Sequence, residues 1–296
     1  MGEKRLYRYQ VVDVFTQTAL EGNPLAVFLH AADLNRSMMQ SIARELCLPE
    51  TVFVVGSRRA DCVARLRIFT PGKEMDFAGH PTVGTGFVLV QQGSVSAGTR
   101  NFCVEENVGA IAITVDQQER SMFWLRTPPV KDGPEIDKDA AAAMITLPSS
   151  ELGDSSPQVL SAGNPALFIA LKDKSAVDNA VLSSSEWIAI RKRYHPDPMC
   201  AFVFAPTSEG AYSRMFAPDY GVAEDPATGS TTGPLAVYMM RNGMTSGKAG
   251  SRFVSEQGTR MGRKSTLHVR VHGEKGRDGI DVGGFVTPVI DGEICI

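Results

Sequence analysis

Apolar and polar residues alternate in two stretches of the first third of the chain. In residues 62–69, every second position from Cys62 to Ile68 is apolar and two arginines lie between them, and residues 7–15 show a similar alternation. A period of two is typical of a strand with one buried face. Residues 51–55 are almost wholly apolar, as expected for a strand inside a core. The pattern therefore predicts strands at 7–15, 51–55 and 62–69.

Three other segments show a helical pattern. Leu34, Met38, Ile42 and Leu46 recur at helical spacing, with Asp33 or Asn35 as the candidate N-cap. Residues 82–90 follow Pro81 and carry no charge, and residues 233–240 repeat this composition before the pair 242–243, a typical helix end. A helix without a polar face must be buried on every side. We therefore expect one amphipathic helix and two central, buried helices.

The chain repeats itself. Residues 22–28 (GNPLAVF) return as 163–169 (GNPALFI), residues 67–71 (RIFTP) as 214–218 (RMFAP), and residues 78–80 (AGH) as 228–230 (TGS). The matches keep the same order at similar offsets, which indicates a duplicated fold.

From this repeat we predict an α/β (α+β) protein of two pseudo-symmetric halves. Each half is expected to be a curled, mostly antiparallel sheet or barrel around a central apolar helix. The first half is expected to span 1–127 plus a C-terminal strand at about 286–296, and the second 128–285. Residues 127–160 are expected to form the crossing, and strands near 267–271, 279–286 and 293–296 to close the sheets.

Composition narrows the possible partners and compartment. The chain has 30 Lys and Arg against 33 Asp and Glu, a net charge of -3, which gives no basic field for nucleic acid. Five cysteines without a C-x-x-C pair are typical of a reducing cytoplasm. The sequence has no uncharged apolar run near the roughly 18 to 20 residues of a membrane helix. We expect a cytoplasmic protein that binds neither nucleic acid nor membranes, and the scattered histidines and missing nucleotide motifs imply no metal and no cofactor.

Polar residues gather where the two buried helices should begin. Gly79 and His80 precede the first, and Gly229 and Ser230 the second. The amide end of a helix can hold a carboxylate, although each glycine could equally serve only a tight turn. Asp225 lies just before the second helix, where it could also be a turn initiator. Two such helix ends predict a binding site for a small carboxylate.

Glu50 is the candidate acid/base. It follows Pro49 and precedes the apolar strand at 51–55, where partial burial would raise its pKa toward neutrality. The alternative is a solvated glutamate at a helix-to-strand junction, and spacing alone does not decide between the two.

The motifs together resemble the PhzF-like phenazine-biosynthesis family. The likeness runs through residues 13–15, 21–27, 42–45, 49–51, 67–71, 77–81, 214–218, 220–225, 227–230, 256–258 and 261–263. It implies a diaminopimelate-epimerase-like fold, a homodimer with one active site per chain between the halves, and a cofactor-independent isomerase. The implied reaction moves a proton from C3 to C1 of trans-2,3-dihydro-3-hydroxyanthranilate or a closely similar small carboxylate.

The resemblance also assigns roles by matching motif. Glu50 would be the acid/base. His80, Asp225 and Ser230 would bind and orient the substrate, and Gly79 and Gly229 would offer backbone N–H groups to its carboxylate.

The sequence departs from the family pattern just before Glu50. Pro49 stands where the family usually has a small polar residue, and Cys47 where Asn is common.

Three alternative functions stay open. A racemase or epimerase of the same fold would use two facing thiols, but the two positions hold Ala78 and Thr228. A non-catalytic member that binds a small carboxylate or a protein partner would retain the same glycines, and the sequence leaves the substrate open.

Overall fold

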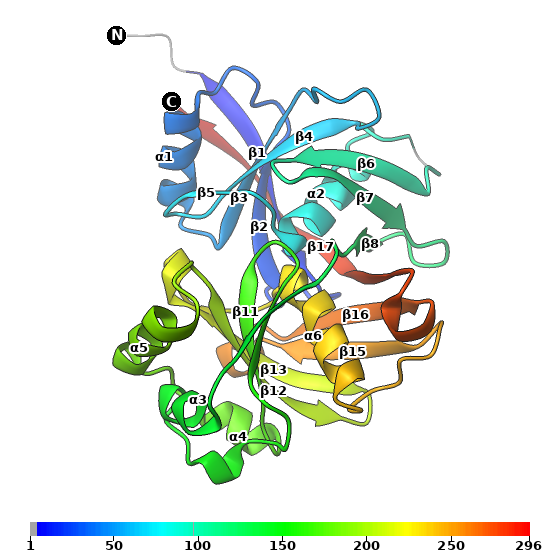
Figure 1. The fold of residues 1–296 in the computed structure, drawn as a ribbon. Coiled ribbons are helices and arrows are strands. Elements are labelled where there is room, and N and C mark those ends of the chain that lie inside the picture. The colour runs from blue at the N-terminus through cyan, green and yellow to red at the C-terminus, as the bar shows by residue number, and fades with distance from the viewer. Residues whose placement is uncertain (1–4, 97) are drawn as a thin grey trace. The chain divides into compact units, whose positions relative to one another are not determined.

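The computed structural model describes residues 5–96 and 98–296, so residues 1–4 of the predicted first half lie outside it. The chain divides into two compact units. Unit 1 comprises the described residues up to Arg126 together with Gly283–Ile296, and unit 2 comprises Thr127–Val282. Figure 1 shows the elements of both.

Unit 1 contains two helices and most of the strands from the first part of the chain. Its elements are β1 Leu6–Val14, β2 Asn23–Phe28, α1 Arg36–Leu46, β3 Glu50–Val55, β4 Ala64–Phe69, β5 Glu74–Met75, α2 Gly79–Gln91, β6 Asn101–Glu106, β7 Gly109–Val115, β8 Met122–Arg126 and the greater part of β17 Gly279–Cys295.

Eight strands of unit 1 close into a barrel. Neighbours pair in the order β1, β2, β3, β4, β6, β7, β8 and β17, and β17 pairs back onto β1. The pairs β2–β3 and β4–β6 are parallel, whereas the other pairs with a printed register are antiparallel. The alternation in β4 puts Leu66 and Ile68 in the core, each 1% exposed, with Arg65 and Arg67 on the other face.

Helix α2 fills the barrel. It packs against β1, β2, β3, β7 and β8, and every residue from Gly79 to Gly86 is buried. Only a glycine fits at position 84, because an added Cβ would lie 2.7 Å from side-chain atoms of both Leu25 and Val14. The prediction of a helix buried on every side is confirmed, with Phe87 and Val90 only half-buried.

Unit 2 contains four helices and the remaining strands. Its elements are β9 Lys131–Glu135, α3 Lys138–Met144, β10 Gln158–Ser161, β11 Pro165–Ala170, α4 Lys174–Asn179, α5 Ser184–Tyr194, β12 Cys200–Thr207, β13 Gly210–Ala217, β14 Val222–Asp225, α6 Gly229–Arg241, β15 Arg252–Gln257 and β16 Ser265–His272, with short 3₁₀ turns at Ser149–Glu151, Pro218–Tyr220, Thr259–Met261 and Glu274–Gly276.

The central strands of unit 2 are buried on both faces. Phe168 and Phe202 point to a core that contains α6, while Leu167 and Ala201 point to a second core that contains α3, α4 and α5. The sequence of a strand that is buried on both faces is a continuous run of apolar residues, without the alternation of apolar and polar positions. Helix α6 packs against β10, β11 and β16.

The two units repeat one topology, and the predicted fold class is confirmed. In unit 2 the pairs β11–β12 and β13–β15 are parallel, matching β2–β3 and β4–β6 of unit 1. The repeat extends to side chains. Arg67 donates two hydrogen bonds to Glu74 at 2.8 and 2.9 Å, and Arg214 donates two to Glu224, both at 2.8 Å.

Three local predictions are corrected. Asn35 caps α1 by accepting from the Met38 N–H at 2.9 Å, but Met38 itself is exposed, and the buried face is formed by Met39, Ile42 and Ala43. The strands expected at 279–286 and 293–296 are one continuous strand, β17. Residues 127–160 are not a bare crossing, because they form β9, α3 and β10 of unit 2.

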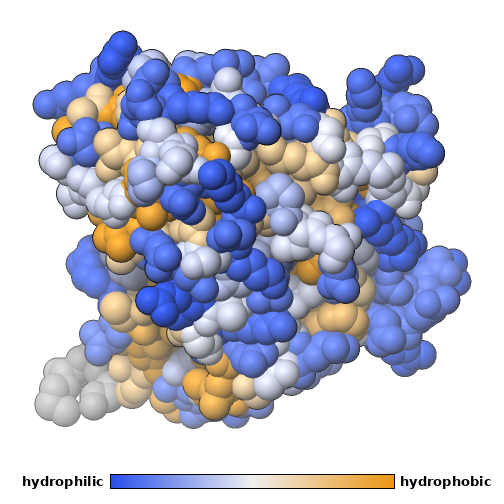
Figure 2. All heavy atoms as spheres, turned by 90° about the horizontal axis from the view of Figure 1, so that it is seen from below, coloured by the Kyte–Doolittle hydropathy of each residue, from blue (hydrophilic) through white to orange (hydrophobic). Residues whose placement is uncertain are grey.

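Ten large apolar side chains are recorded as exposed in the described residues, among them Leu6, Leu20 and Val181. On the face drawn in Figure 2 apolar side chains lie scattered among polar residues. None of the helices in the described residues combines the length and the apolar character that crossing a bilayer requires.

Candidate active site

Glu50 and His80 meet in unit 1. Glu50 is the first residue of β3, and His80 lies in the first turn of α2. Glu50 Oε2 lies 3.1 Å from His80 Nε2, with the two side chains 16% and 4% exposed. The position expected for Glu50, at the start of an apolar strand, is confirmed, and residues 51–54 behind it are buried.

Burial holds the imidazole of His80 neutral. Desolvation lowers the pKa of His80 from 6.5 to about 3, because a buried imidazolium loses its hydration. The contact with Glu50 therefore joins a neutral imidazole to a carboxyl group.

Asn23 fixes the orientation of this imidazole. It is the first residue of β2 and is fully buried, and its Nδ2 lies 3.2 Å from His80 Nδ1. With the amide N–H donating to Nδ1, the imidazole proton sits on Nε2, which faces Glu50. The arrangement places a potential donor without net charge 3.1 Å from the Glu50 carboxyl group.

A second polar cluster lies at the start of α6 in unit 2. Asp225, the last residue of β14, accepts a hydrogen bond of 2.5 Å from Thr228 Oγ1. Gln257, fully buried at the end of β15, accepts from the Thr228 N–H at 3.1 Å and donates to Thr228 Oγ1 at 3.0 Å and to the Asp225 carbonyl at 2.7 Å. Asp225 is thereby held in one position, 7% exposed.

The two predicted glycines each open a central helix. Gly79 is the first residue of α2 after the N-cap Ala78, and Gly229 is the first of α6 after the N-cap Thr228. Ser230 follows Gly229 and is 6% exposed. The first N–H groups of a helix have no partner within it and carry its positive end. Both helices thus present amide donors next to polar side chains.

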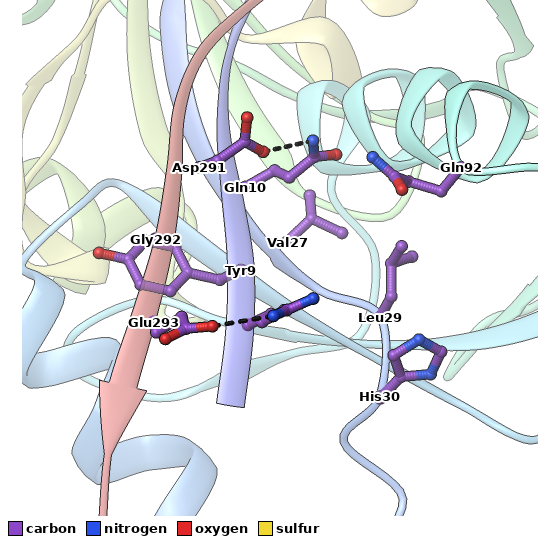
Figure 3. Close-up of a pocket in the computed structure, with 10 residues that line it drawn as sticks. Tyr9, Gln10, Val27, Leu29, His30, Gln92, Asp291, Gly292 and Glu293 are labelled. Atoms are coloured by element: carbon purple, nitrogen blue, oxygen red, sulfur yellow. Dashed lines mark hydrogen bonds and ion pairs between the residues drawn. The ribbon is translucent and has the colours of Figure 1, made fainter. Parts of the chain in front are cut away.

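Two other features of unit 1 do not involve the predicted residues. A hollow of about 690 Å³ lies beside β1, β2 and the end of β17, where Gln10 bonds Asp291 and Arg8 bonds Glu293 (Figure 3). In the described residues, one group of potential metal ligands comes together, formed by Asp61, Cys62 and Cys103. Burial raises the pKa of the Cys103 thiol to about 12.

Comparison with known proteins decides the family. The profile of the phenazine biosynthesis-like proteins matches residues 12–292. The chain belongs to this family.

Named members of the phenazine biosynthesis-like family include enzymes. The chain is 34% identical, over 90% of its length and 91% of the relative's, to trans-2,3-dihydro-3-hydroxyanthranilate isomerase of Pseudomonas chlororaphis. A predicted epimerase from Pseudomonas aeruginosa superposes with a TM-score of 0.82 at 29% identity, covering 97% of this chain and 99% of that one. A PhzF-family protein of Bacillus anthracis has a TM-score of 0.84 at 24% identity over 99% and 100% of the chains, and shows the shared fold. The chain is an isomerase of this family.

The two departures from the family pattern lie in the turn before Glu50. Cys47 caps α1 in a left-handed conformation, with φ of 51°, a conformation that Gly and Asn adopt more readily. An Asn or Gly at this position would adopt the conformation with less strain. The turn still delivers Glu50 to His80.

The sequence prediction missed residues that support the candidate site. Asn23 lies in the repeated Gly-Asn-Pro motif, and the repeat was the signal that could have drawn attention to it. Gln257 and its counterpart Glu106 lie in a further repeat, F-x-x-E-E against F-x-x-E-Q, at 102–106 and 253–257. That match becomes visible once β6 and β15 are seen to occupy equivalent places in the two units.

Proposed function

We propose that Glu50 is the acid/base residue of an isomerase that moves a proton from C3 to C1 of a small cyclic carboxylate. The substrate we propose is trans-2,3-dihydro-3-hydroxyanthranilate, the compound in the name of the Pseudomonas chlororaphis relative, or a close analogue.

The contact between Glu50 and His80 carries the proposal. A general base must be unprotonated before it acts and must then hold the proton it has taken. His80 Nε2 lies 3.1 Å from the carboxyl group, close enough to donate to it once the two groups align around the substrate, and a neutral imidazole does not fix the carboxylate as the partner of a cation. Glu50 can therefore accept a proton and release it again.

One carboxyl group suffices for this reaction. Glu50 removes the proton from C3 and returns a proton to C1 on the same face of the ring, and the resulting enol becomes a ketone. General acid/base catalysis supplies about 10²- to 10⁴-fold, so orientation of the ring must contribute further. Proton transfer by a carboxyl group requires no electron transfer, and the proposal includes no cofactor.

The amide ends of α2 and α6 are proposed to bind the substrate. Backbone N–H groups at Gly79 and Gly229 would donate to its carboxylate, as helix N-termini do for anions. Asp225 is an acceptor suited to an amine or hydroxyl group on the ring, and Ser230 can either donate or accept. The hydrogen bond from Thr228 to Asp225 at 2.5 Å keeps that carboxylate in place.

The alternative of a racemase with two thiols has no support in the site. The N-cap positions that would carry the thiols hold Ala78 and Thr228, and the Thr228 hydroxyl is already bonded to Asp225. A homodimer is also part of the proposal, and light scattering on the purified protein tests it.

The substitution Glu50→Gln tests the catalytic role. We expect isomerisation to fall by at least about 10²-fold, while the variant folds and still binds a substrate analogue. In deuterated water, the wild type should introduce deuterium at a ring carbon of the product and Glu50→Gln should not. Glu45→Gln, the same change at an exposed position of α1, is the matched control and should keep wild-type activity. Wild-type turnover in Glu50→Gln would remove Glu50 from the mechanism.

A further inference from the structure

Glu106 is a buried carboxyl group to which the proposed reaction gives no part. It is the last residue of β6 and is 2% exposed. Its Oε1 lies 2.5 Å from Thr82 Oγ1 in the first turns of α2, and the Ala78 N–H, at the N-cap of that helix, also bonds to the carboxyl group. Its Oε2 is buried without a hydrogen-bond partner in the described residues.

Thr82 Oγ1 has one proton and two acceptors within reach, so the direction of its contact with Glu106 depends on whether Glu106 carries a proton. Thr82 Oγ1 lies 2.7 Å from the carbonyl oxygen of Ala78 and 2.5 Å from Glu106 Oε1. A hydroxyl group has one proton, and a carbonyl oxygen can only accept. If Thr82 donates to Ala78, the hydrogen of the second contact must come from Glu106. Both contacts are hydrogen bonds only when Glu106 is a carboxylic acid.

The equivalent position in unit 2 holds a neutral group of the same shape. Gln257 ends β15 as Glu106 ends β6. Gln257 Oε1 accepts from the N–H of the N-cap residue Thr228, and its Nε2 donates to Thr228 Oγ1. A protonated glutamate offers the same pair, one accepting oxygen and one donating group, whereas a carboxylate can only accept.

Among the residues that the structure describes, none places a cation against Glu106 to balance a charge. Opposite it, β7 has Gly109 and no charged residue. On the paired strand β4, Arg65 approaches Glu105, whose side chain bonds Ser57.

The helix side is equally poor in charge. In α2 the titratable group is His80, held neutral by burial, and the segment before α2 carries Asp76, a further acid. Burial, which disfavours the charged form, raises the pKa of Glu106 to about 8.

We propose that Glu106 is a positioning residue that acts as a neutral carboxylic acid, tying the N-cap and the first turns of α2 to β6 as Gln257 ties those of α6 to β15. Its loss of a proton would place a negative charge behind the amide end of α2. This consequence rests on the proposed function, in which that helix end binds the carboxylate of the substrate. Like charges would then repel, and substrate binding would weaken at alkaline pH while the chemical step stays unchanged.

The first experiment measures the proton itself and needs no substrate. Infrared difference spectra between wild type and Glu106→Gln at pH 7 should show the band of a buried carboxylic acid. Its absence, with a carboxylate band instead, would overturn the proposal.

Stability gives a second test that is independent of turnover. Between pH 4.5 and about 8 the folded protein keeps a proton that unfolded Glu106 has released, so stability falls as pH rises through this window. Relative to Glu106→Gln, the unfolding equilibrium constant of the wild type should rise by about tenfold per pH unit. Glu105→Gln, the same change one residue earlier, is the control and should show a constant difference from the wild type between pH 6 and 8. Equal pH dependence of wild type and Glu106→Gln would contradict the proposal.

Kinetics then test the positioning role. For the wild type we expect KM to rise by about tenfold between pH 7 and pH 9 with little change in kcat, and for Glu106→Gln we expect KM to stay flat. A KM rise that persists in Glu106→Gln would overturn this role alone. Should the chain turn over no dihydro-hydroxyanthranilate, the proposed function fails, and the infrared and stability measurements still decide the protonation of Glu106.

Discussion

Nε2 of His80 lies 3.1 Å from Oε2 of Glu50, although burial keeps the imidazole uncharged. The pair is therefore a close contact between a carboxyl group and a neutral imidazole. Asn23, on the opposite side of the ring, decides which nitrogen carries the proton. Three predictions follow from the packing around this pair and around the second central helix.

Asn23→Asp should lower kcat by about tenfold or more while leaving KM nearly unchanged. The substitution keeps the size of the side chain but replaces the donor to His80 Nδ1 with an acceptor. The imidazole proton would then move to Nδ1, and Glu50 would lose its donor; a wrong tautomer of a catalytic histidine is known to be costly. Steady-state kinetics and the ¹⁵N shifts of His80 measure the effect. Asn101→Asp, at an exposed position of β6, serves as the control, and unchanged kcat in Asn23→Asp would show that the tautomer does not matter.

His80 should make the protein less stable as the pH falls. Its pKa is lowered from 6.5 to about 3 in the folded state, so between these values the unfolded chain binds a proton that the folded chain does not. The contribution of His80 to the free energy of unfolding is fully present above pH 6.5. Below that pH it declines by about 1.4 kcal/mol per pH unit. Chemical denaturation of wild type and His80→Gln at pH 7, 6 and 5 measures the difference, in which contributions of other groups cancel. A difference that stays constant over this range would mean that His80 titrates normally.

Gly233→Ala should destabilise the protein by about 1 to 3 kcal/mol. The added Cβ would lie 2.9 Å from the Cβ of Thr127, an atom that cannot move without the backbone. The gain of about 1 kcal/mol in helix propensity does not offset this overlap. Urea denaturation gives the free energy of unfolding, and Gly56→Ala, with open space around the new methyl group, is the control. Thr127→Ala should partly rescue Gly233→Ala, and full stability of the single variant would disprove the close packing.

Periodicity and repetition predicted the fold class because they reflect burial directly. The uncharged segments at 82–90 and 233–240 had to be central, and they lie in α2 and α6. The face of α1 was misplaced by one position, since Met38 and Met39 are equally apolar and only packing against the barrel distinguishes them. The continuity of β17 was missed because Gly283, Gly284 and Gly292 and Pro288 normally interrupt strands.

The sequence predicted only part of the candidate site, because the site depends on contacts between residues that are distant in the chain. Glu50 and His80 are 30 positions apart, and their encounter depends on how β3 and α2 sit in the barrel. In the sequence, Asn23 stood out as part of the repeated segment at 22–28 and Gln257 only within a family-like segment, while nothing singled out Glu106. Their importance comes from partners brought together by strand pairing, which no local pattern reveals. The roles of Asp225, Ser230, Gly79 and Gly229 stay predictions until variants are measured.

The pairing of β17 with both β1 and β8 has a consequence for biosynthesis. The strand that closes the barrel of unit 1 follows almost all of unit 2 in the chain, so it is synthesised later. A nascent chain that has emerged from the ribosome as far as residue 282 therefore still has β1 and β8 as open edges, and the N-terminal half completes its fold after the C-terminal half has been made.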